Sequence, residues 1–131
     1  MSGKVLMVSN PCNTLSLVFR KYADKISADD ITFLSLLDQM RASSAIHRKL
    51  RLTEKSVQNI FVIGNHSNTM FLDVSGAYVS GEKLVKVLSI EELIEIQKNV
   101  RTRGGEILQL QKHSASYSAA LSILHHLNFM Y

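Results

Sequence analysis

Three side chains, His66, Asp38 and Arg41, are of types that could support acid–base chemistry on a carboxylic acid. His66 follows the apolar run NIFVIG, and it can take or give a proton near neutral pH because the reference pKa of histidine is about 6.5. Asp38 and Arg41 are spaced i and i+3 and can face one cleft if a helix carries both. A carboxylate that orients an imidazole, beside a guanidinium that binds a carboxylate through two hydrogen bonds, makes a coherent acid–base site for a hydroxy acid.

Each of these residues also has an ordinary structural explanation. His66 could be a loop histidine with no chemical role, and Asp38 stands where a helix cap is expected. A nuclease-like or metal-based role for His113, His125 and His126 is a remote third option. Adjacent histidines on a helix point in different directions, and no Cys or acidic residue is spaced to complete the ligand set. We therefore expect no metal site.

The first apolar runs predict a strand-helix-strand arrangement. Residues 4–10 (KVLMVSN) are typical of a strand buried on both faces of a parallel sheet, and they end at an Asn-Pro pair. A helix should follow, capped by Asn13 or Thr14. Its inner face is predicted to contain Leu15, Val18, Phe19 and Tyr22. Residues 31–37 form either a second strand or an apolar connector.

The middle of the chain predicts one helix, one buried strand and hairpins. The helix after Asp38 has its inner face at Ala42, Ala45, Ile46 and Leu50. Residues 59–64 (NIFVIG) give the clearest strand, because they are β-branched and aromatic and end at a glycine. Residues 71–89 contain two Ser-Gly breaks between short β-prone pieces, which favours antiparallel hairpin strands.

Two helices are expected in the last third of the chain. Ser89 and Glu92 make a capping box for the first helix, which contains Gly104-Gly105. Its shared face is predicted to be Ile90, Leu93, Ile94, Gln97 and Val100. Paired glycines inside a helix suggest a break, a close backbone contact or a functional approach. The last helix starts near Ser114, and its buried residues are predicted to be Ala119, Ala120, Ile123, Leu124 and Leu127.

These elements predict an α/β domain that takes on α+β character in its second half. The 131 residues are enough for one globular domain with a real core and too few for two. In such sheets, ligands bind at the carboxyl ends of the strands, where both Asn10 and His66 are placed.

Composition excludes several other classes. The formal net charge is +4, but the basic residues are scattered apart from Arg48, Lys49 and Arg51, which favours a solvated helix end over a nucleic-acid partner. A single cysteine, Cys12, excludes an internal disulfide. We see no leader segment and no apolar run of membrane-spanning length, so we expect a soluble cytoplasmic protein with no membrane partner.

Five ordered segments carry a resemblance to malate dehydrogenase, of the lactate/malate dehydrogenase superfamily. They are SNPCNT (9–14), LLDQMRA (36–42), GNHSNTMFLDV (64–74), RGGEIL (103–108) and KHSASYSAA (112–120). The resemblance covers nearly the whole chain, and GNHS followed by DV favours the cytosolic type over the lactate dehydrogenases. It implies a partial fold of this superfamily, with a few parallel strands, an antiparallel hairpin and long helices.

The resemblance also implies roles for the site residues. His66 matches the residue that exchanges a proton with the malate hydroxyl, and Asp38 matches its carboxylate partner. Arg41 matches the arginine that binds the carboxylate next to the reacting carbon. Asn10 matches the asparagine that hydrogen-bonds substrate near the nicotinamide ring, and Gly104 matches a glycine of the substrate pocket. Ala115 departs from the family pattern, which usually has Ser there.

For the complete enzyme, the resemblance implies malate and oxaloacetate as substrates, NAD as cofactor and a homo-oligomer such as a dimer. This chain has no G-x-G-x-x-G turn, and the family's mobile loop and final strands would lie before Lys4 and after Tyr131. We expect residues up to about 40 to be the end of the dinucleotide-binding sheet and residues from about 41 to 131 to be the catalytic portion. We expect an incomplete fragment with little or no activity; the alternative is a non-catalytic binding or oligomerisation module.

Overall fold

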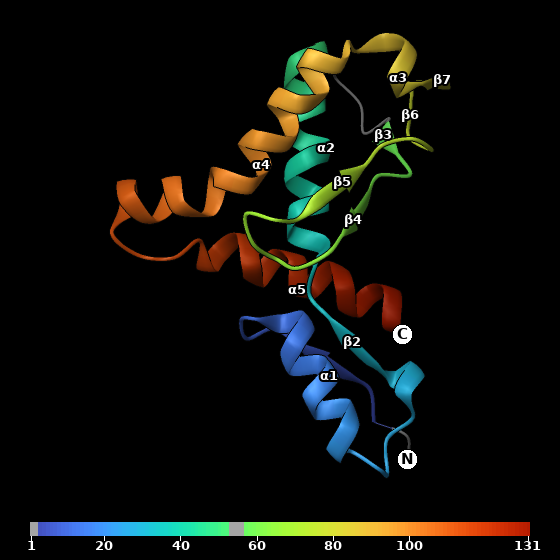
Figure 1. Ribbon diagram of the computed structural model, residues 1–131, viewed down its shortest axis with the longest axis vertical. Coiled ribbons are helices and arrows are strands. Elements are labelled where there is room, and N and C mark those ends of the chain that lie inside the picture. Colours follow the sequence, from blue (N-terminus) through green and yellow to red (C-terminus); the bar gives the residue numbers. More distant parts are fainter. Residues whose placement is uncertain (1–2, 53–56) are drawn as a thin grey trace.

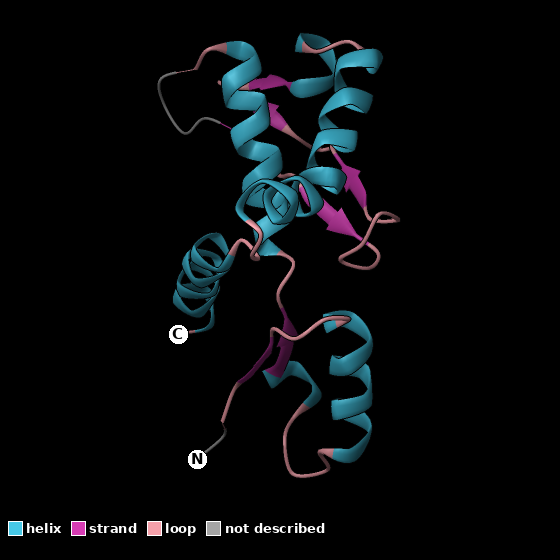
Figure 2. Ribbon diagram, turned by 90° about the vertical axis from the view of Figure 1, so that its left-hand side faces the viewer, coloured by secondary structure: helices cyan, strands magenta, loops and turns pink. Residues whose placement is uncertain are grey.

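The computed structural model describes residues 3–52 and 57–131 (Figure 1). Its first part contains β1 (Val5–Met7), α1 (Cys12–Tyr22), a 3-10 turn (Ala28–Asp30), β2 (Ile31–Phe33) and α2 (Leu36–Leu50). Its second part contains β3 (Val57–Gln58), β4 (Phe61–Ile63), β5 (Phe71–Asp73), β6 (Tyr78–Val79), β7 (Glu82–Lys83), α3 (Leu84–Val87), α4 (Ile90–Gln111) and α5 (Ser116–Met130). Figure 2 shows β1, α1 and β2 at one end of the molecule, with α2, α4 and the remaining strands at the other.

The first unit is a parallel pair of strands joined through a helix. β1 and β2 pair in parallel with Val5 opposite Ile31, and α1 packs against both strands. The expected parallel strand at residues 4–10 is therefore confirmed, and residues 31–37 prove to be a short strand followed by the start of α2. The strand is only partly buried, so the expectation of burial on both faces is wrong for the residues that the structure describes.

The predicted cap of α1 is wrong, and its predicted inner face is right at two of four positions. The helix begins at Cys12, directly after Pro11, and no side chain caps it, so Asn13 and Thr14 lie within its first turn. Its buried residues are Cys12 and Ser16, whereas Val18 is 48% exposed. Leu15 and Phe19, which the prediction did place inside, are partly buried. Val18 and Tyr22 share the apolar spacing but are exposed, because spacing identifies an apolar stripe and not which part of it the sheet covers.

Helix α2 is the centre of the fold and contacts α4, α5, β3 and β4. Ala42 and Ile46 are fully buried and Ala45 and Leu50 pack against the core, as predicted. The core cluster joins this face of α2 to the strands, α3 and α4. Its buried members are Ala42, Ile46, Ile60, Met70, Leu72, Ala77, Val79, Leu84, Leu88, Ile96 and Val100.

The strands after α2 are antiparallel, as predicted. β4 pairs with β5, and β6 pairs with β3 and β7. Ser80 and Gly81 connect β6 and β7 with φ angles of +49° and +87°, the conformation of a two-residue type I′ hairpin turn. Residues 59–64 do contain a strand, β4 at Phe61–Ile63, but Phe61 is 59% exposed and Ile63 is 52% exposed. Successive side chains of a strand alternate between faces, so only Val62 of this strand points toward the core, and the expected full burial is wrong.

Helix α4 begins with the predicted capping box. The Ser89 hydroxyl accepts a hydrogen bond from the Glu92 N–H (3.2 Å), and the Glu92 carboxylate accepts one from the Ser89 N–H (2.9 Å). Of the predicted face, Val100 is buried and Leu93 and Gln97 are partly buried, while Ile90 and Ile94 are exposed; Ile96, which was not predicted, is buried. Gly104 and Gly105 lie within the helix, and Figure 1 shows α4 changing direction along its length, a bend typical of paired small residues.

Helix α5 runs from Ser116 and packs against α2. Its fully buried residue is Ser122. The predicted buried face of this helix is only partly right. Ala119 and Ile123 are partly buried, whereas Ala120, Leu124 and Leu127 are exposed. The helix meets the rest of the described chain along a narrow strip, because small residues allow close approach there. Most of its apolar side chains therefore remain on the surface.

Candidate active site

A buried carboxylate holds the predicted histidine and arginine together. Asp38 lies in the first turn of α2, after the N-cap Ser35, so it is not the helix cap that its position suggested. It is only 2% exposed, and its Oδ2 accepts a short hydrogen bond from Nδ1 of His66. Its Oδ1 accepts a hydrogen bond from Nη1 of Arg41 at 3.2 Å. The carboxylate can only accept, so Nδ1 carries a hydrogen and Nε2 of His66 is left to exchange a proton.

The loop after β4 is held in place by α1. Gly64 follows β4 with a φ of +86°, which turns the chain toward His66. Asn13 clamps this turn, because its Nδ2 donates to the Gly64 carbonyl (2.9 Å) and its Oδ1 accepts from the His66 N–H (3.3 Å). Asn13 is a site residue that sequence reasoning missed, since its position suggested a helix cap. No signal within α1 itself could have shown that it contacts a loop 51 residues away.

Helix α4 faces α2 and the loop after β4 across the site. A cavity of about 90 Å³ lies between them. It is lined by Asp38, Arg41, His66, Ser67, Asn68, Met70, Val100, Arg101 and Gly104. A Cβ added at Gly104 would lie 4.0 Å from Nη1 of Arg41, which is ordinary van der Waals contact. A methyl group at this position would therefore fit beside the guanidinium, so this contact alone does not require a glycine. The nearby Arg101 donates from Nε to the Met70 carbonyl at 2.6 Å.

The electrostatics of the site favour protonated His66. The hydrogen bond to Asp38 raises the pKa of His66 above its ordinary value of 6.5, against the opposing effects of partial burial and of the Arg41 charge. An imidazole whose charged form is stabilised is suited to give a proton to a carbonyl oxygen. The same arrangement accepts a proton from a hydroxyl in the reverse direction. The arrangement can therefore perform reversible proton transfer beside a guanidinium.

Two residues of interest lie away from this cavity. Asn10 is exposed in the bend between β1 and α1, and it is not among the described residues that line the cavity. Ala115 precedes α5 and lines a separate small hollow with Ile107 and Gln111. The structure thus brings together His66, Asp38, Arg41 and Gly104 but does not bring Asn10 to them, so the role of Asn10 stays a prediction.

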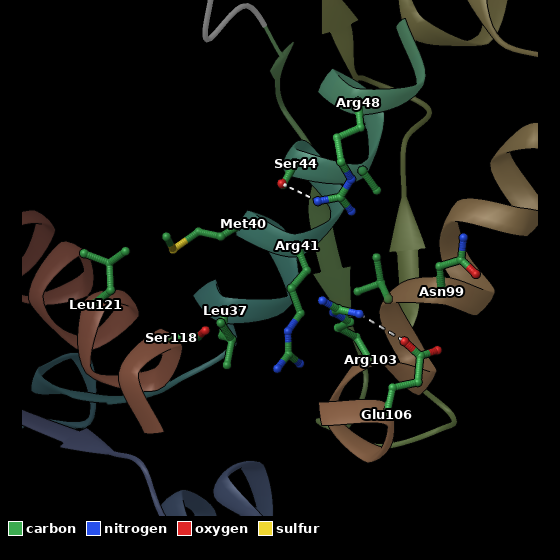
Figure 3. A pocket seen from close by; sticks show the side chains of 12 residues that line it. Leu37, Met40, Arg41, Ser44, Arg48, Asn99, Arg103, Glu106, Ser118 and Leu121 are labelled. Carbon is green, nitrogen blue, oxygen red and sulfur yellow. Dashed lines mark hydrogen bonds and ion pairs between the residues drawn. The ribbon is translucent and has the colours of Figure 1, made fainter. Parts of the chain in front are cut away.

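A larger hollow of about 620 Å³ lies between α2, α4 and α5 (Figure 3). Arg41 lines both this hollow and the smaller cavity, and it is therefore placed between them. The other two arginines of the hollow have partners: Arg48 donates to Ser44 (3.1 Å), and Arg103 donates to Glu106 (3.3 Å). His66 does not line this hollow, so size alone does not identify the candidate site.

The described residues do not form a dinucleotide cradle. A pyrophosphate is normally bound by a glycine-rich turn between a strand and the helix that follows it. Here α1 follows β1 after Asn10-Pro11, and the glycines around the site lie after β4 (Gly64) or inside α4 (Gly104 and Gly105). Residues 3–52 and 57–131 therefore do not fit this cofactor by themselves.

The comparisons with known proteins point in one direction. Residues 35–130 match the family described as lactate/malate dehydrogenase, alpha/beta C-terminal domain. The chain belongs to the lactate/malate dehydrogenase family. It is 37% identical to a cytoplasmic malate dehydrogenase of Zea mays over 95% of this chain and 39% of that protein. It is 35% identical to malate dehydrogenase 3, cytoplasmic, of Arabidopsis thaliana, over 95% of this chain and 38% of that protein.

The fold comparison agrees. The structure matches Trichomonas vaginalis lactate dehydrogenase in complex with NADH and oxamate with a TM-score of 0.87 and 30% identity, covering 94% of this chain and 39% of that one. The predicted fold class, α/β to α+β in a partial fold of this family, is confirmed. The chain spans about two fifths of the length of the curated relatives that it matches.

The remote metal option gains no support from the described part of the chain. No group of three or more His, Cys, Asp or Glu residues within ranges 3–52 and 57–131 could hold a metal ion. His126 instead lies 3.1 Å from the Thr32 hydroxyl, and partial burial lowers the pKa of its imidazole. No helix in those ranges is long and apolar enough to cross a membrane.

Proposed function

We propose that this chain carries the proton-transfer and carboxylate-binding residues of an NAD-dependent malate dehydrogenase that interconverts malate and oxaloacetate in the cytoplasm. The observation that carries the proposal is the buried Asp38 carboxylate, which binds His66 through one oxygen and Arg41 through the other. The names of the curated relatives, which include cytoplasmic malate dehydrogenases, support the substrate and the compartment. The NADH complex of the related lactate dehydrogenase supports the cofactor of the complete enzyme.

The three side chains divide the work on the substrate. Nε2 of His66 accepts the hydroxyl proton of malate, and in reverse the imidazolium gives it to the carbonyl oxygen of oxaloacetate. Asp38 holds the tautomer and stabilises the imidazolium through its hydrogen bond. Arg41 uses one Nη for Asp38 and has further N–H donors for the carboxylate next to the reacting carbon. Proton exchange and substrate alignment therefore depend on a single buried acid.

Two further residues complete the proposal. Gly104 lines the 90 Å³ cavity beside Arg41 and leaves room for the substrate there, where a bulky side chain would occupy part of that space. Asn10, between β1 and α1, hydrogen-bonds substrate near the nicotinamide in the assembled enzyme. We propose that residues 1–131 alone have little or no dehydrogenase activity. Ordinary NADH oxidation with oxaloacetate by the purified chain, abolished in His66→Ala, would contradict that part.

Binding of L-malate tests the proposed function without requiring turnover. Titration of the chain with L-malate, followed by the imidazole NMR signals of His66, should show saturable shifts. Arg41→Gln should weaken binding about tenfold or more, because it removes charge-assisted hydrogen bonds. Arg48→Gln is the matched control, because Arg48 lies on the same helix but donates to Ser44 outside the small cavity. Signals of His66 that do not respond to L-malate would overturn the proposal.

A second candidate function is a binding or oligomerisation module. It is favoured by the exposed apolar residues of α5 and its end, among which Leu124 is 61% exposed and Phe129 is 82% exposed. Such surfaces favour self-association or pairing with a full-length relative. Light scattering of the chain alone and mixed with an intact malate dehydrogenase subunit distinguishes the candidates. A monomer in both samples would refute the module, and it would also argue against the homo-oligomer expected of the complete enzyme.

A further inference from the structure

The loop that carries His66 depends on α1 for its position. Past His66 the loop has hydrogen bonds of its own, such as the bond from the Met70 N–H to the Ser67 carbonyl (3.1 Å). At residues 64–66, Asn13 bonds to the Gly64 carbonyl and to the His66 N–H. Among the described residues, no other side chain from outside the loop bonds to the backbone of this stretch. The backbone that carries the imidazole is therefore held in place by a single residue of α1.

The carboxamide of Asn13 has one orientation that satisfies its neighbours. Its Nδ2 donates to the Gly64 carbonyl (2.9 Å), and its Oδ1 accepts from the His66 N–H (3.3 Å). The thiol of Cys12, which is 1% exposed, also donates to this Oδ1 at 3.4 Å. A carbonyl oxygen can only accept and an N–H can only donate, so a flipped amide would lose these bonds. Asparagine is a short side chain that carries both the donor and the acceptor that this arrangement needs.

Asp38 is anchored to the same pair of strands by a different route. Leu34 lies between β2 and α2, and its N–H donates to the Met7 carbonyl of β1 at 3.0 Å. Asp38 follows in the first turn of α2. Helix α1, which carries Asn13, packs against both β1 and β2. The carboxylate and the imidazole therefore meet from one support, since Asp38 is fixed along the chain and His66 is fixed through Asn13.

We infer that Asn13 is a positioning residue that holds the His66 backbone where the imidazole meets both Asp38 and the hydroxyl of a bound substrate. The inference rests on the proposed function, in which Nε2 of His66 exchanges a proton with that hydroxyl. None of the described residues 3–33 lines the small cavity, so Asn13 acts through His66 and not on the substrate. The β1–α1 unit thereby sets the geometry of proton transfer from outside the cavity.

L-malate and succinate provide the test, because succinate is malate without the hydroxyl. The dissociation constant of each acid is measured on the full chain from the Nε–Hε NMR signal of Arg41. We expect Asn13→Ala to weaken malate about two- to tenfold, which corresponds to one hydrogen bond, and to leave succinate unchanged. Thr14→Ala is the control and should weaken neither acid, because Thr14 lies in the same turn of α1 but is exposed.

The pKa of His66 in the absence of any acid gives a second readout. The hydrogen bond to Asp38 is the largest effect that raises this pKa, and the bond depends on where the imidazole lies. Asn13→Ala leaves Asp38 and Arg41 in the chain, so a change of pKa reports a change in the position of His66. We expect the pKa to fall in Asn13→Ala and to stay unchanged in Thr14→Ala.

The outcomes separate the inference from the function on which it rests. If neither acid binds to the unmodified chain, the proposed function fails, and the pKa of His66 alone decides the positioning by Asn13. An unchanged pKa in folded Asn13→Ala overturns the inference, as does an equal loss of malate and succinate or a loss of neither. Should Asn13→Ala unfold, hydrogen exchange at Nδ2 of Asn13 in the unmodified chain decides. Malate should slow this exchange and succinate should not, and equal effects of the two acids would overturn the inference.

Discussion

Replacing Asp38 by Asn perturbs the group on which the whole site depends. The change keeps the size of the side chain but removes the charge of a residue that is 2% exposed. An amide can present its oxygen to only one neighbour and must turn its NH₂ toward the other. It therefore cannot accept from Nδ1 of His66 and Nη1 of Arg41 together, as the carboxylate does. At least one donor loses its partner.

The expected cost follows from the exposure of the two donors. Breaking a fully buried ion pair costs about 3–5 kcal/mol, but the side chains of Arg41 and His66 are 14% and 28% exposed and can recover some hydration. We therefore expect Asp38→Asn to lower the free energy of unfolding by about 2–3 kcal/mol. The pKa of His66 should also fall, because the Asp38 hydrogen bond is the largest effect that raises it.

Urea unfolding followed by circular dichroism measures the first effect, and NMR titration of His66 measures the second. The folded pKa of His66 is raised above its unfolded value, so its stabilising effect is fully present below pH of about 6.5 and is lost as the pH rises through the folded pKa. The difference between the two proteins should thus shrink as the pH rises above about 6.5 and through the folded pKa of His66. Asp24→Asn, at an exposed position, is the control and should change stability by about 0.5 kcal/mol or less. A loss at Asp38 no larger than this, with an unchanged His66 pKa, would refute the reasoning.

Three further predictions concern the elements around the site. Asn13→Ala should destabilise the fold by about 1–2 kcal/mol and speed amide exchange at His66, because two hydrogen bonds to the loop are lost; Asn128→Ala, on exposed α5, should leave that exchange unchanged. Ser89→Ala should lower the unfolding free energy by about 1 kcal/mol in urea titration, and no loss would mean that the capping box is not formed. Ile46→Val should cost about 0.5–1.5 kcal/mol in the same assay, since Ile46 is fully buried, and a neutral result would contradict its place in the core.

Local signals predicted local structure well. The Ser89–Glu92 capping box and the hairpin at residues 71–89 are set by contacts within a few residues, and both are present. The inner faces of α1 and α5 were predicted poorly, because periodicity identifies an apolar stripe but not the neighbour that covers it. Val18 and Leu124 fit their stripes and are nonetheless exposed.

The contacts of the site likewise fall into those that local spacing predicts and those between residues distant in the sequence. The i, i+3 spacing predicted that Asp38 and Arg41 share one side of a helix, and they form an ion pair. The contact of Asp38 with His66 spans 28 residues. Residue types suggested it as a hypothesis and the family resemblance supported it, but no spacing rule could establish it. The clamp by Asn13 depends on how α1 meets the end of β4, which no local pattern encodes. Asn10 was singled out by its place after a predicted strand and by the resemblance, and it is not among the described residues that line the cavity.

The pKa of His66 with and without saturating L-malate tests the central claim most directly. If the site binds malate as proposed, the bound carboxylates stabilise the imidazolium and the pKa of His66 rises further above its already raised value. Arg41→Gln should abolish the rise at the same malate concentration. A pKa of His66 that is identical with and without malate, in a chain that stays folded, would contradict the account.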